Sequence, residues 1–476
     1  MNCYVGIDVG HTKIKSGLFD RSGRLLCMSS KETPFVSNVV ETEKLWICVA
    51  ECIRNLIANS GVDATQIKAV ACAGHGNGLY AIDKEGKALQ HAYAATTQIG
   101  QKALARWKDS GIDREIYPYI LQEMWVGQPL PILADLKSDY PQVYEEIDHI
   151  MFCKDFVNYC LTGHVFTDYT DASAAGILNT TQGTYSRQIL KQLELEDVAD
   201  MLPGLKKSTD VVGYVTNQAA VATGLKEGTI VAGGCFDVVA SLLGTGICEN
   251  DTCGMISGTW GINALVSQKL PKVQKFLQCT CFVDGQEFLF IESAPTSSVN
   301  LEWLLKRVFC NVTYEGANQI VEKFSAADVS ALYLPYIYGD LRGGHNHGAF
   351  YGLTSENNWE TMIRAVYEGV ALGHRKQLQK LIDSDTGFER IVLVGGAAAS
   401  KIWCQIFADV LNRDVYVPKN SNVGMLGTAM IAAVACGEYK DYKEACSTMK
   451  GNYNVYEPNL ENVKYYNQKY KMFCEI

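Results

Sequence analysis

The apolar stretch CYVGIDVG (residues 3–10) ends in a glycine turn, and the segment KIKSGLFD (residues 13–20) follows it directly. Together with the next turn, RSGR, and the segment LLCMSS, this stretch predicts a meander of three strands. From residue 44 onward, apolar residues recur at helical spacing, which predicts an amphipathic helix. KAVACAG (residues 68–74) then predicts a buried strand. Alternation of strands and helices indicates an α/β fold.

The second half of the chain repeats this order of elements. TCGMISGTWGINALVS (residues 252–267) predicts a strand, a glycine turn and a second strand. RIVLVGGAAASKIWCQIFADVLN (residues 390–412) predicts a buried strand, a turn of small residues and an amphipathic helix. We therefore expect two domains of one architecture, residues 1–246 and residues 247–476.

Composition excludes several classes of protein. The 476 residues include 47% hydrophobic and 20% charged side chains, with a net charge of -10. This charge argues against a broad nucleic-acid or anionic-membrane surface, although backbone amides can still bind a small anion. The 17 scattered cysteines contain no CxxC pair and predict reduced thiols in a cytoplasmic protein. No secretion signal and no membrane-spanning stretch is recognised.

Three glycine turns follow apolar strands: DVGHTK (residues 8–13), SGTWG (residues 257–261) and GGAAAS (residues 395–400). Glycine lets backbone N–H groups approach a phosphate closely, and nearby hydroxyls add donors. Taken singly, each turn is more simply explained as a tight turn, because glycine turns are common. Three together favour a nucleotide site, and the absence of GxxxxGK[ST] argues against the phosphate-loop class.

Two aspartates stand alone among glycine and apolar residues. Asp8 is either a turn-initiating residue or a carboxylate held near Mg²⁺. Asp237, in GGCFDVVASLLGTG (residues 233–246), is either the N-cap of the helix that follows or a carboxylate that reaches a substrate hydroxyl. The two roles of Asp237 are compatible, so both interpretations stay open from the residues alone.

Two histidine-containing segments carry further polar groups. HGNG (residues 75–78) follows a predicted buried strand, and in α/β sheets ligands bind at that end of a strand. A polar turn explains the same residues. The segment HNH, which contains His345 and His347, invites a metal interpretation. No third ligand lies at a clear spacing, so we expect an exposed loop there.

As an ordered set, these motifs resemble the FGGY carbohydrate kinases, a branch of the actin-like sugar kinases, over nearly the whole chain. The matching segments are GIDVGHTKIKSGLFD, DFVNYCLTG, TDYTDAS, GGCFD, LPYIYG, GAFYGLTSENNWETMIRAVYEG and VGGAAAS. The resemblance implies two actin-like (ribonuclease H-like) α/β domains with an interdomain cleft. It gives the sugar site and the catalytic base to residues 1–246 and the nucleotide site to residues 247–476.

The resemblance also implies roles for single residues. Asp237 falls on the catalytic base, and Asp8 falls on the acidic residue beside the metal and the phosphates. Gly76, Asn77 and Asp237 fall on the sugar site. The residues that fall on the nucleotide-binding loops are Gly10, His11, Thr12, Lys13, Gly258, Thr259, Gly395, Gly396, Ala397 and Ser400. The implied cofactors are ATP and Mg²⁺, with Mg²⁺ near Asp8, directly or through water.

We therefore expect an ATP-dependent sugar kinase in which Asp237 accepts the proton of the attacking hydroxyl. Within the family the chain most resembles L-xylulose and xylulose kinases, which implies a ketopentose such as L-xylulose. Asn77 stands where D-xylulose kinases carry histidine, and His11 replaces a small or hydroxyl residue. The alternatives are a kinase of another polyol or sugar acid (glycerol, erythritol, gluconate-like) and an actin-like ATPase switch. The expected partners are the sugar and a second copy in a homodimer, without nucleic acid or membrane.

Overall fold

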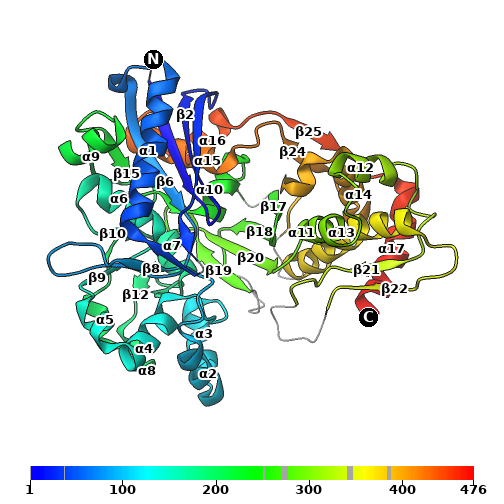
Figure 1. The fold of residues 1–476 in the computed structure, drawn as a ribbon, viewed down its shortest axis with the longest axis horizontal. Coiled ribbons are helices and arrows are strands. Elements are labelled where there is room, and N and C mark those ends of the chain that lie inside the picture. Colours follow the sequence, from blue (N-terminus) through cyan, green and yellow to red (C-terminus); the bar gives the residue numbers. More distant parts are fainter. Residues whose placement is uncertain (1, 37, 250–251, 271–276, 340–346, 383–386) are drawn as a thin grey trace. The chain divides into compact units, whose positions relative to one another are not determined.

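The computed structural model describes the whole chain except residues 1, 37, 250–251, 271–276, 340–346 and 383–386. The chain forms two compact units, each described separately below (Figure 1). Unit 1 comprises Met1–Cys248, Gln278–Leu289 and Asn422–Gly451. Unit 2 comprises Glu249–Leu277, Phe290–Ser421 and Asn452–Ile476.

Unit 1 is built on a mixed sheet with the strand order β14-β15-β6-β1-β2-β3, in which β16 also pairs with β6. Strand β1 is antiparallel to β2 and parallel to β6, and β15 and β16 are also parallel to β6. The strands are β1 (Cys3–Val9), β2 (Lys13–Asp20), β3 (Leu25–Glu32), β6 (Ile67–Gly74), β14 (Val211–Tyr214), β15 (Ile230–Ala232) and β16 (Cys235–Phe236). The predicted three-strand meander is therefore confirmed as β1, β2 and β3.

Helices cover the sheet of unit 1 on both faces. Helix α1 (Thr42–Ser60) packs on β2 and β3 through the predicted apolar stripe, which includes Leu45, Val49 and Cys52. Helices α10 (Asp237–Gly244) and α15 (Val423–Ala435) pack against one another and against β6, and α15 also packs on β1. The two helices approach so closely that a Cβ atom at Gly427 would lie 1.9 Å from the carbonyl oxygen of Ala240. Only glycine fits at that crossing.

A second apolar core of unit 1 lies among shorter elements that follow β6 in the chain. These elements include β7 (Tyr80–Ile82), α2 (Gln101–Ser110), α3 (Ile112–Ile120), α4 (Pro129–Asp139), α5 (Pro141–Glu146), β9 (His149–Met151), α7 (Tyr169–Ala174) and α8 (Arg187–Gln192). The neighbouring α6 (Cys153–Thr162) and β10 (Phe166–Asp168) contribute instead to the apolar core around the main sheet. Trp107 of α2 is 2% exposed in this core. Helices α6 and α7 matter most for function, because they lie next to β6 and β16 respectively.

Unit 2 repeats the hairpin-and-parallel arrangement, with the strand order β20-β18-β17-β23-β24-β25. Strand β17 is antiparallel to β18 and parallel to β23, as β1 is to β2 and β6. The strands are β17 (Thr252–Ser257), β18 (Gly261–Ser267), β20 (Phe288–Ala294), β23 (Arg390–Gly395), β24 (Val415–Pro418) and β25 (Tyr453–Tyr456). The equivalent hairpins support the prediction that the two halves share one architecture.

The helices of unit 2 include one long buried helix, α13 (Trp359–Ile382), which packs on α14 (Lys401–Leu411) and α11 (Val299–Arg307). Helix α17 (Leu460–Glu475) packs on α14. The predicted strand, small-residue turn and helix over residues 390–412 are confirmed as β23, a short 3₁₀ turn and α14. In the described part of the chain, we find no helix with the length and hydropathy that crossing a membrane requires.

Candidate active site

Three parallel strand ends of unit 1 bring the predicted sugar-site residues together. Asp8 of β1 pairs with Ala73 of β6, and Cys235 of β16 pairs with the same Ala73. Asp237 follows β16 directly, and the HGNG loop follows β6. Because the strands are parallel, these residues lie at one carboxyl edge of the sheet, where α/β proteins bind ligands.

Asp237 is the first residue of α10, and the predicted N-cap role is wrong. The cap position belongs to Phe236, whose φ and ψ are -54° and 139°. The backbone N–H of Phe236 donates to the hydroxyl of Thr170 at 2.8 Å, which fixes the start of the helix from a distant segment. The side chain of Asp237 is half-buried. Burial, followed by the charge of Asp8, raises the pKa of Asp237 to about 7, while a hydrogen bond from the Val238 N–H lowers it.

Asp8 is also half-buried, and burial raises the pKa of its carboxyl group, an effect that Lys15 partly offsets. Its carboxylate lies against the first turn of α15. A Cβ atom at Gly424 would come within 2.8 Å of the Asp8 Oδ2 atom. The close approach of this glycine therefore limits where the Asp8 carboxylate can move.

Asn77 presents a buried side-chain oxygen that has no hydrogen-bond partner in the protein. The residue is 6% exposed, and its Oδ1 atom is unsatisfied. Its backbone has a φ of 63°, a left-handed conformation that asparagine tolerates better than most residues. The neighbouring Gly76 packs on the ring of Phe236, at a distance that excludes any side chain. A buried unpaired amide oxygen is costly, so this atom is suited to accept a hydrogen bond from a ligand.

An aromatic cluster that the sequence did not predict stands beside this loop. The ring centroid of Phe35 lies 4.2 Å from that of His11 and 5.4 Å from that of His75. The His75 Nε2 atom is 3.1 Å from the hydroxyl oxygen of Tyr80. Burial, followed by the nearby His11, lowers the pKa of His75 to about 3, so its imidazole is neutral near neutral pH. His11 itself is exposed at the turn between β1 and β2.

The turn between β1 and β2 carries the other predicted phosphate-binding residues of unit 1. The Gly10 N–H donates to the Lys13 carbonyl oxygen at 3.0 Å, which closes the turn. Thr33 also stabilises the turn, because its hydroxyl donates to the Gly10 carbonyl oxygen at 2.7 Å. The side chains of Thr12 and Lys13 are exposed and remain accessible to a ligand.

In unit 2 the SGTWG turn, the GGAAAS turn and the start of α11 meet. A Cβ atom at Gly395, whose φ is 96°, would lie 2.4 Å from the Ser257 carbonyl oxygen. The hydroxyl of Ser298 donates to the carbonyl oxygen of Gly258 at 2.8 Å. Thr259 is exposed, and Gly258 is half-buried. The structure thus brings the two predicted nucleotide turns of this unit side by side.

Ala397 and Ser400, two further predicted nucleotide-binding residues, lie in the GGAAAS turn and differ in their surroundings. Ala397 is fully buried. The hydroxyl of Ser400 caps α14 by accepting from the Trp403 N–H, and it donates to the Asn318 Oδ1 atom at 2.7 Å. The Ser400 hydroxyl is therefore engaged within the protein, and its nucleotide role stays a prediction. Gly396 packs close to the Ser298 hydroxyl.

A buried ionic cluster in unit 1 was missed by sequence reasoning. Lys154 places its Nζ atom 3.0 Å from Asp168 Oδ1 and 3.2 Å from Asp171 Oδ2, and it also pairs with Asp155. All four side chains are at most 1% exposed. Asp168 also accepts from the Thr170 hydroxyl, which in turn receives the Phe236 N–H. The cluster therefore supports the segment that presents Asp237. The only sequence signal was the carboxylates of DFVNYCLTG and TDYTDAS.

The structure bears on the two metal sites that the sequence raised, one at Asp8 and one at His345 and His347. Within the described residues, no group of three or more histidine, cysteine, aspartate or glutamate side chains is placed to hold a metal ion. His345 lies outside the described residues, and His347 is exposed. Mg²⁺ that accompanies a nucleotide is usually held by one or two carboxylates and the phosphates. Asp8 by itself fits that mode of binding. All 17 cysteines are free thiols.

Comparison with known proteins gives consistent results. Residues 3–244 match the family model of the FGGY family of carbohydrate kinases, N-terminal domain, and residues 253–436 match its C-terminal domain. A probable L-xylulose kinase of Pasteurella multocida is 30% identical, over 100% of this chain and 98% of that protein. The L-xylulose/3-keto-L-gulonate kinase of Escherichia coli is 30% identical, over 99% of this chain and 96% of that protein.

A solved structure confirms the fold. The crystal structure of ligand-bound xylulose kinase from Lactobacillus acidophilus matches with a TM-score of 0.91 at 22% identity, over 100% of this chain and 97% of that one. The α/β fold with two actin-like domains is therefore confirmed. The boundary between residues 246 and 247 stays a prediction.

Proposed function

The chain belongs to the FGGY family of carbohydrate kinases, and we propose that its sugar is a ketopentose, L-xylulose first, with Asp237 as the general base. Membership makes the protein an ATP-dependent sugar phosphotransferase. In the reaction a sugar hydroxyl oxygen bonds to the γ-phosphorus of ATP, and the bond from that phosphorus to the bridging oxygen breaks. ADP leaves, and the hydroxyl proton passes to an Oδ atom of Asp237.

The observation that carries this proposal is the setting of Asp237. A general base works best when its pKa lies near the working pH, and burial with the charge of Asp8 raises the pKa of Asp237 to about 7. An aspartate that only capped a helix would have no use for such a shift. Asp237 follows β16 and the HGNG loop follows β6, so the proposed base and the proposed sugar loop share one carboxyl edge, which supports the proposal.

Mg²⁺ would be held at Asp8, directly or through water, together with the phosphates of ATP. Bound there, the ion would neutralise charge that develops on the phosphoryl group. The chain contributes a carboxylate whose freedom is limited by the backbone at Gly424. The turn of residues 10–13 presents the Thr12 hydroxyl and the Lys13 ammonium group for the phosphates.

The nucleotide role of unit 2 follows from its two adjoining turns. The exposed Thr259 offers a hydroxyl to phosphate oxygens, and the Gly258 N–H closes the turn by donating to the Trp260 carbonyl oxygen at 3.1 Å. The turn at Gly395 and Gly396 forms the adenosine side of the proposed site. The Ser298 hydroxyl at the start of α11 holds the first of these turns by donating to the carbonyl oxygens of Ser257 and Gly258, and Gly396 of the second turn packs close to the same hydroxyl.

The proposed sugar rests on Asn77 and on the relatives. The two relatives at 30% identity are named for L-xylulose, one of them also for 3-keto-L-gulonate. The unpaired Oδ1 atom of Asn77 is suited to accept a hydrogen bond from a sugar hydroxyl, and its amide N–H groups can donate to another. The homodimer and the cytoplasmic location stay predictions.

A substrate screen tests the proposal. ADP release would be measured with ketopentoses, alditols and sugar acids, including L-xylulose, D-xylulose, glycerol, erythritol and gluconate. We expect the highest kcat/KM for L-xylulose. A clear preference for an alditol or a sugar acid would overturn the ketopentose assignment. ADP release that no sugar stimulates would favour an ATPase switch.

A further inference from the structure

A chain of hydrogen bonds runs beneath the SGTWG turn of unit 2. The Ser257 Oγ atom lies 2.8 Å from the Ser297 Oγ atom, which lies 2.8 Å from His374 Nε2. His374 Nδ1 is 3.0 Å from the Asn263 Oδ1 atom, and the Asn263 amide donates to Gln377 at 2.6 Å. Ser257, Asn263, Ser297 and His374 are each at most 2% exposed.

The protonation of His374 fixes the direction of this chain. Burial lowers the pKa of His374 to about 3, so the imidazole is neutral and carries one proton. The Asn263 amide nitrogen already donates to Gln377, so its oxygen faces the ring and accepts from Nδ1–H. The Nε2 atom then accepts from the Ser297 hydroxyl, and that hydroxyl accepts from Ser257. In this arrangement the buried Ser297, His374 and Asn263 side chains are each paired within the chain.

The residues of this hydrogen-bond chain, and Ser298 next to them, contact the SGTWG turn at several points. Ser297 donates its backbone N–H to the Thr259 carbonyl oxygen at 3.0 Å. The hydroxyl of the next residue, Ser298, donates to the carbonyl oxygens of Ser257 and Gly258. A Cβ atom at Gly261 would lie 3.2 Å from His374 Nε2, so the ring packs directly under the second strand of the hairpin. Movement of His374 would therefore move the turn.

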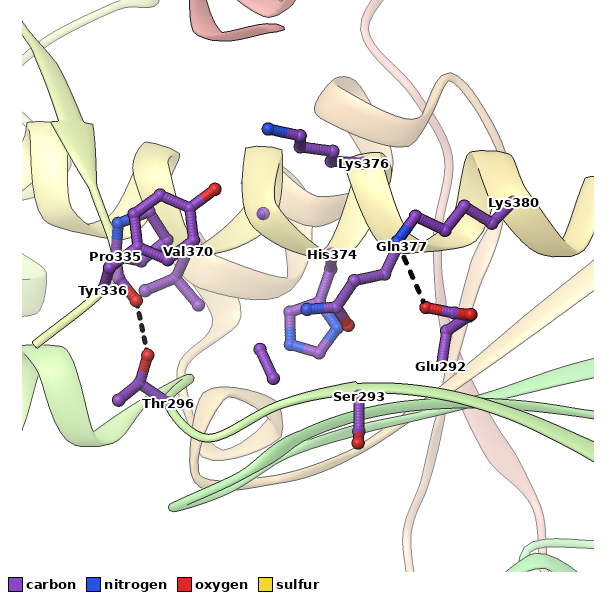
Figure 2. Close-up of a pocket in the computed structure, with 12 residues that line it drawn as sticks. Glu292, Ser293, Thr296, Pro335, Tyr336, Val370, His374, Lys376, Gln377 and Lys380 are labelled. Carbon is purple, nitrogen blue, oxygen red and sulfur yellow. Dashed lines mark hydrogen bonds and ion pairs between the residues drawn. The ribbon is translucent and has the colours of Figure 1, made fainter. Parts of the chain in front are cut away.

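The other side of His374 faces a small polar pocket of about 90 Å³ (Figure 2). Figure 2 shows the imidazole extending from α13 toward the strand that carries Ser293. Gln377, at the far end of the hydrogen-bond chain, also lines the pocket, and Lys380 pairs there with Glu292 at 3.5 Å. A pocket of this volume has room for water. His374 thus lies between this pocket and the proposed nucleotide turn.

We propose that His374 is a positioning residue that holds Ser257–Thr259 in the geometry required to bind ATP phosphates. This inference rests on the proposed function, since it assigns the SGTWG turn to the nucleotide. His374 touches neither sugar nor phosphate in this account. His374 acts through Ser297. Its Nε2 atom accepts the hydrogen bond of the Ser297 hydroxyl, and this hydrogen bond holds the turn.

Two conservative variants separate this role from a general packing role. His374→Gln can place an acceptor oxygen near the former Nε2 position, whereas His374→Asn can place only an amide near the former Nδ1 position. Calorimetry on the full chain would measure the affinity for ADP and for a non-hydrolysable ATP analogue, with Mg²⁺ present. We expect His374→Gln to stay within about twofold of the wild type and His374→Asn to lose roughly tenfold.

Thermal unfolding of the same variants provides the control. If His374 only packs the core, nucleotide affinity will follow melting temperature and the two variants will not differ in binding. Equal nucleotide affinity in both variants, whether lowered or unchanged, would overturn the inference. If His374→Asn does not fold, Ser297→Ala takes its place, because it removes the donor to His374. Unchanged nucleotide affinity in folded Ser297→Ala would likewise overturn it.

The outcome is independent of the sugar. If the wild type binds nucleotide and phosphorylates sugar while His374→Asn binds nucleotide normally, only the positioning role fails. If the wild type binds nucleotide but phosphorylates no sugar, the proposed function fails while the comparison of the two variants still decides the role of His374. If the wild type binds no nucleotide and the two variants do not differ from it, both the proposed function and the positioning role of His374 fail.

Discussion

Asp8 lies on β1 and Asp237 directly follows β16, two strands that flank β6, and burial together with the charge of Asp8 raises the pKa of Asp237 to about 7. Two neighbouring carboxyl groups resist simultaneous ionisation, so their environments separate their roles. In the proposed reaction one carboxylate serves the metal and phosphates, and the other exchanges a proton with the sugar. This division gives direct consequences for pH dependence and stability.

The activity of the wild type should fall below about pH 7. Only the ionised form of Asp237 can accept a proton, and its pKa is about 7. We expect kcat/KM for the sugar to approach a tenfold loss per pH unit well below that value. The measurement is kcat/KM between pH 5.5 and 8.5 with saturating ATP. A profile that stays flat down to pH 5.5 would exclude a base with this pKa.

Replacing Asp237 with asparagine should stabilise the protein at alkaline pH. The native state keeps the Asp237 proton up to about pH 7, whereas the unfolded chain loses it near pH 3.8. The native state therefore binds more protons between these values, and the free energy of unfolding falls as pH rises through this window. Because Asp237 is partly exposed, we expect Asp237→Asn to gain about 1–3 kcal/mol at pH 8 and less at pH 5.

Urea unfolding of the wild type and Asp237→Asn at both pH values measures this gain. The exposed Asp109 of α2 offers a matched control, since Asp109→Asn changes the same charge at the surface. A variant that is destabilised equally at pH 5 and pH 8 would show that the carboxyl group of Asp237 contributes structure rather than strain.

Gly258→Val should weaken ATP binding without harming the fold. Gly258 does not have a positive φ, and a Cβ atom there would meet nothing nearer than the Trp260 carbonyl oxygen at 3.8 Å. The new side chain would therefore stand where a phosphate approaches the turn. We expect a loss in nucleotide affinity of at least tenfold with little change in sugar KM or melting temperature.

Gly395→Ala provides the contrast for that variant. Its Cβ atom would lie 2.4 Å from the Ser257 carbonyl oxygen, and its φ of 96° disfavours a side chain. We expect this variant to lose stability as well as nucleotide affinity. Normal ATP affinity in folded Gly258→Val would remove the SGTWG turn from the phosphate site.

Asn77 should select the sugar. Truncation to alanine removes the unpaired Oδ1 atom and should lower kcat/KM for the best ketopentose. The expected loss corresponds to about 1–3 kcal/mol of transition-state stabilisation, while the ATP KM stays nearly unchanged. Asn77→His should change the order of preference between L-xylulose and D-xylulose. The measurement is kcat/KM for each epimer. Equal losses on every sugar, or none, would make the HGNG loop a structural element.

The sequence predicted those parts of the molecule that local patterns encode. Alternating and helical periodicity located β1 to β3, α1, and the turn between β23 and α14. Glycine turns at strand ends marked the SGTWG and GGAAAS segments, which the structure brings together. The positions of Asp8 and Asp237 at one sheet edge follow from parallel pairing with β6, which strand alternation already indicates.

Long-range contacts decided what the sequence could not show. The N-cap prediction for Asp237 failed because the backbone N–H of Phe236 is held by Thr170, which is 66 residues away. No local sequence pattern around Lys154 indicates that three carboxylates, from α6, β10 and α7, surround its ammonium group. The return of residues 422–451 to unit 1, which places Gly424 against Asp8, likewise follows from packing rather than from local pattern.

Turnover by Asp237→Asn tests the central claim most directly. The variant keeps the shape of the side chain but loses the proton acceptor, which typically costs about 10²–10⁴-fold in rate. We predict such a loss in sugar-dependent ADP release, with ATP affinity by calorimetry close to that of the wild type and with Asp109→Asn fully active. Wild-type kcat in folded Asp237→Asn would contradict the account, because Asp237 would then not be the base.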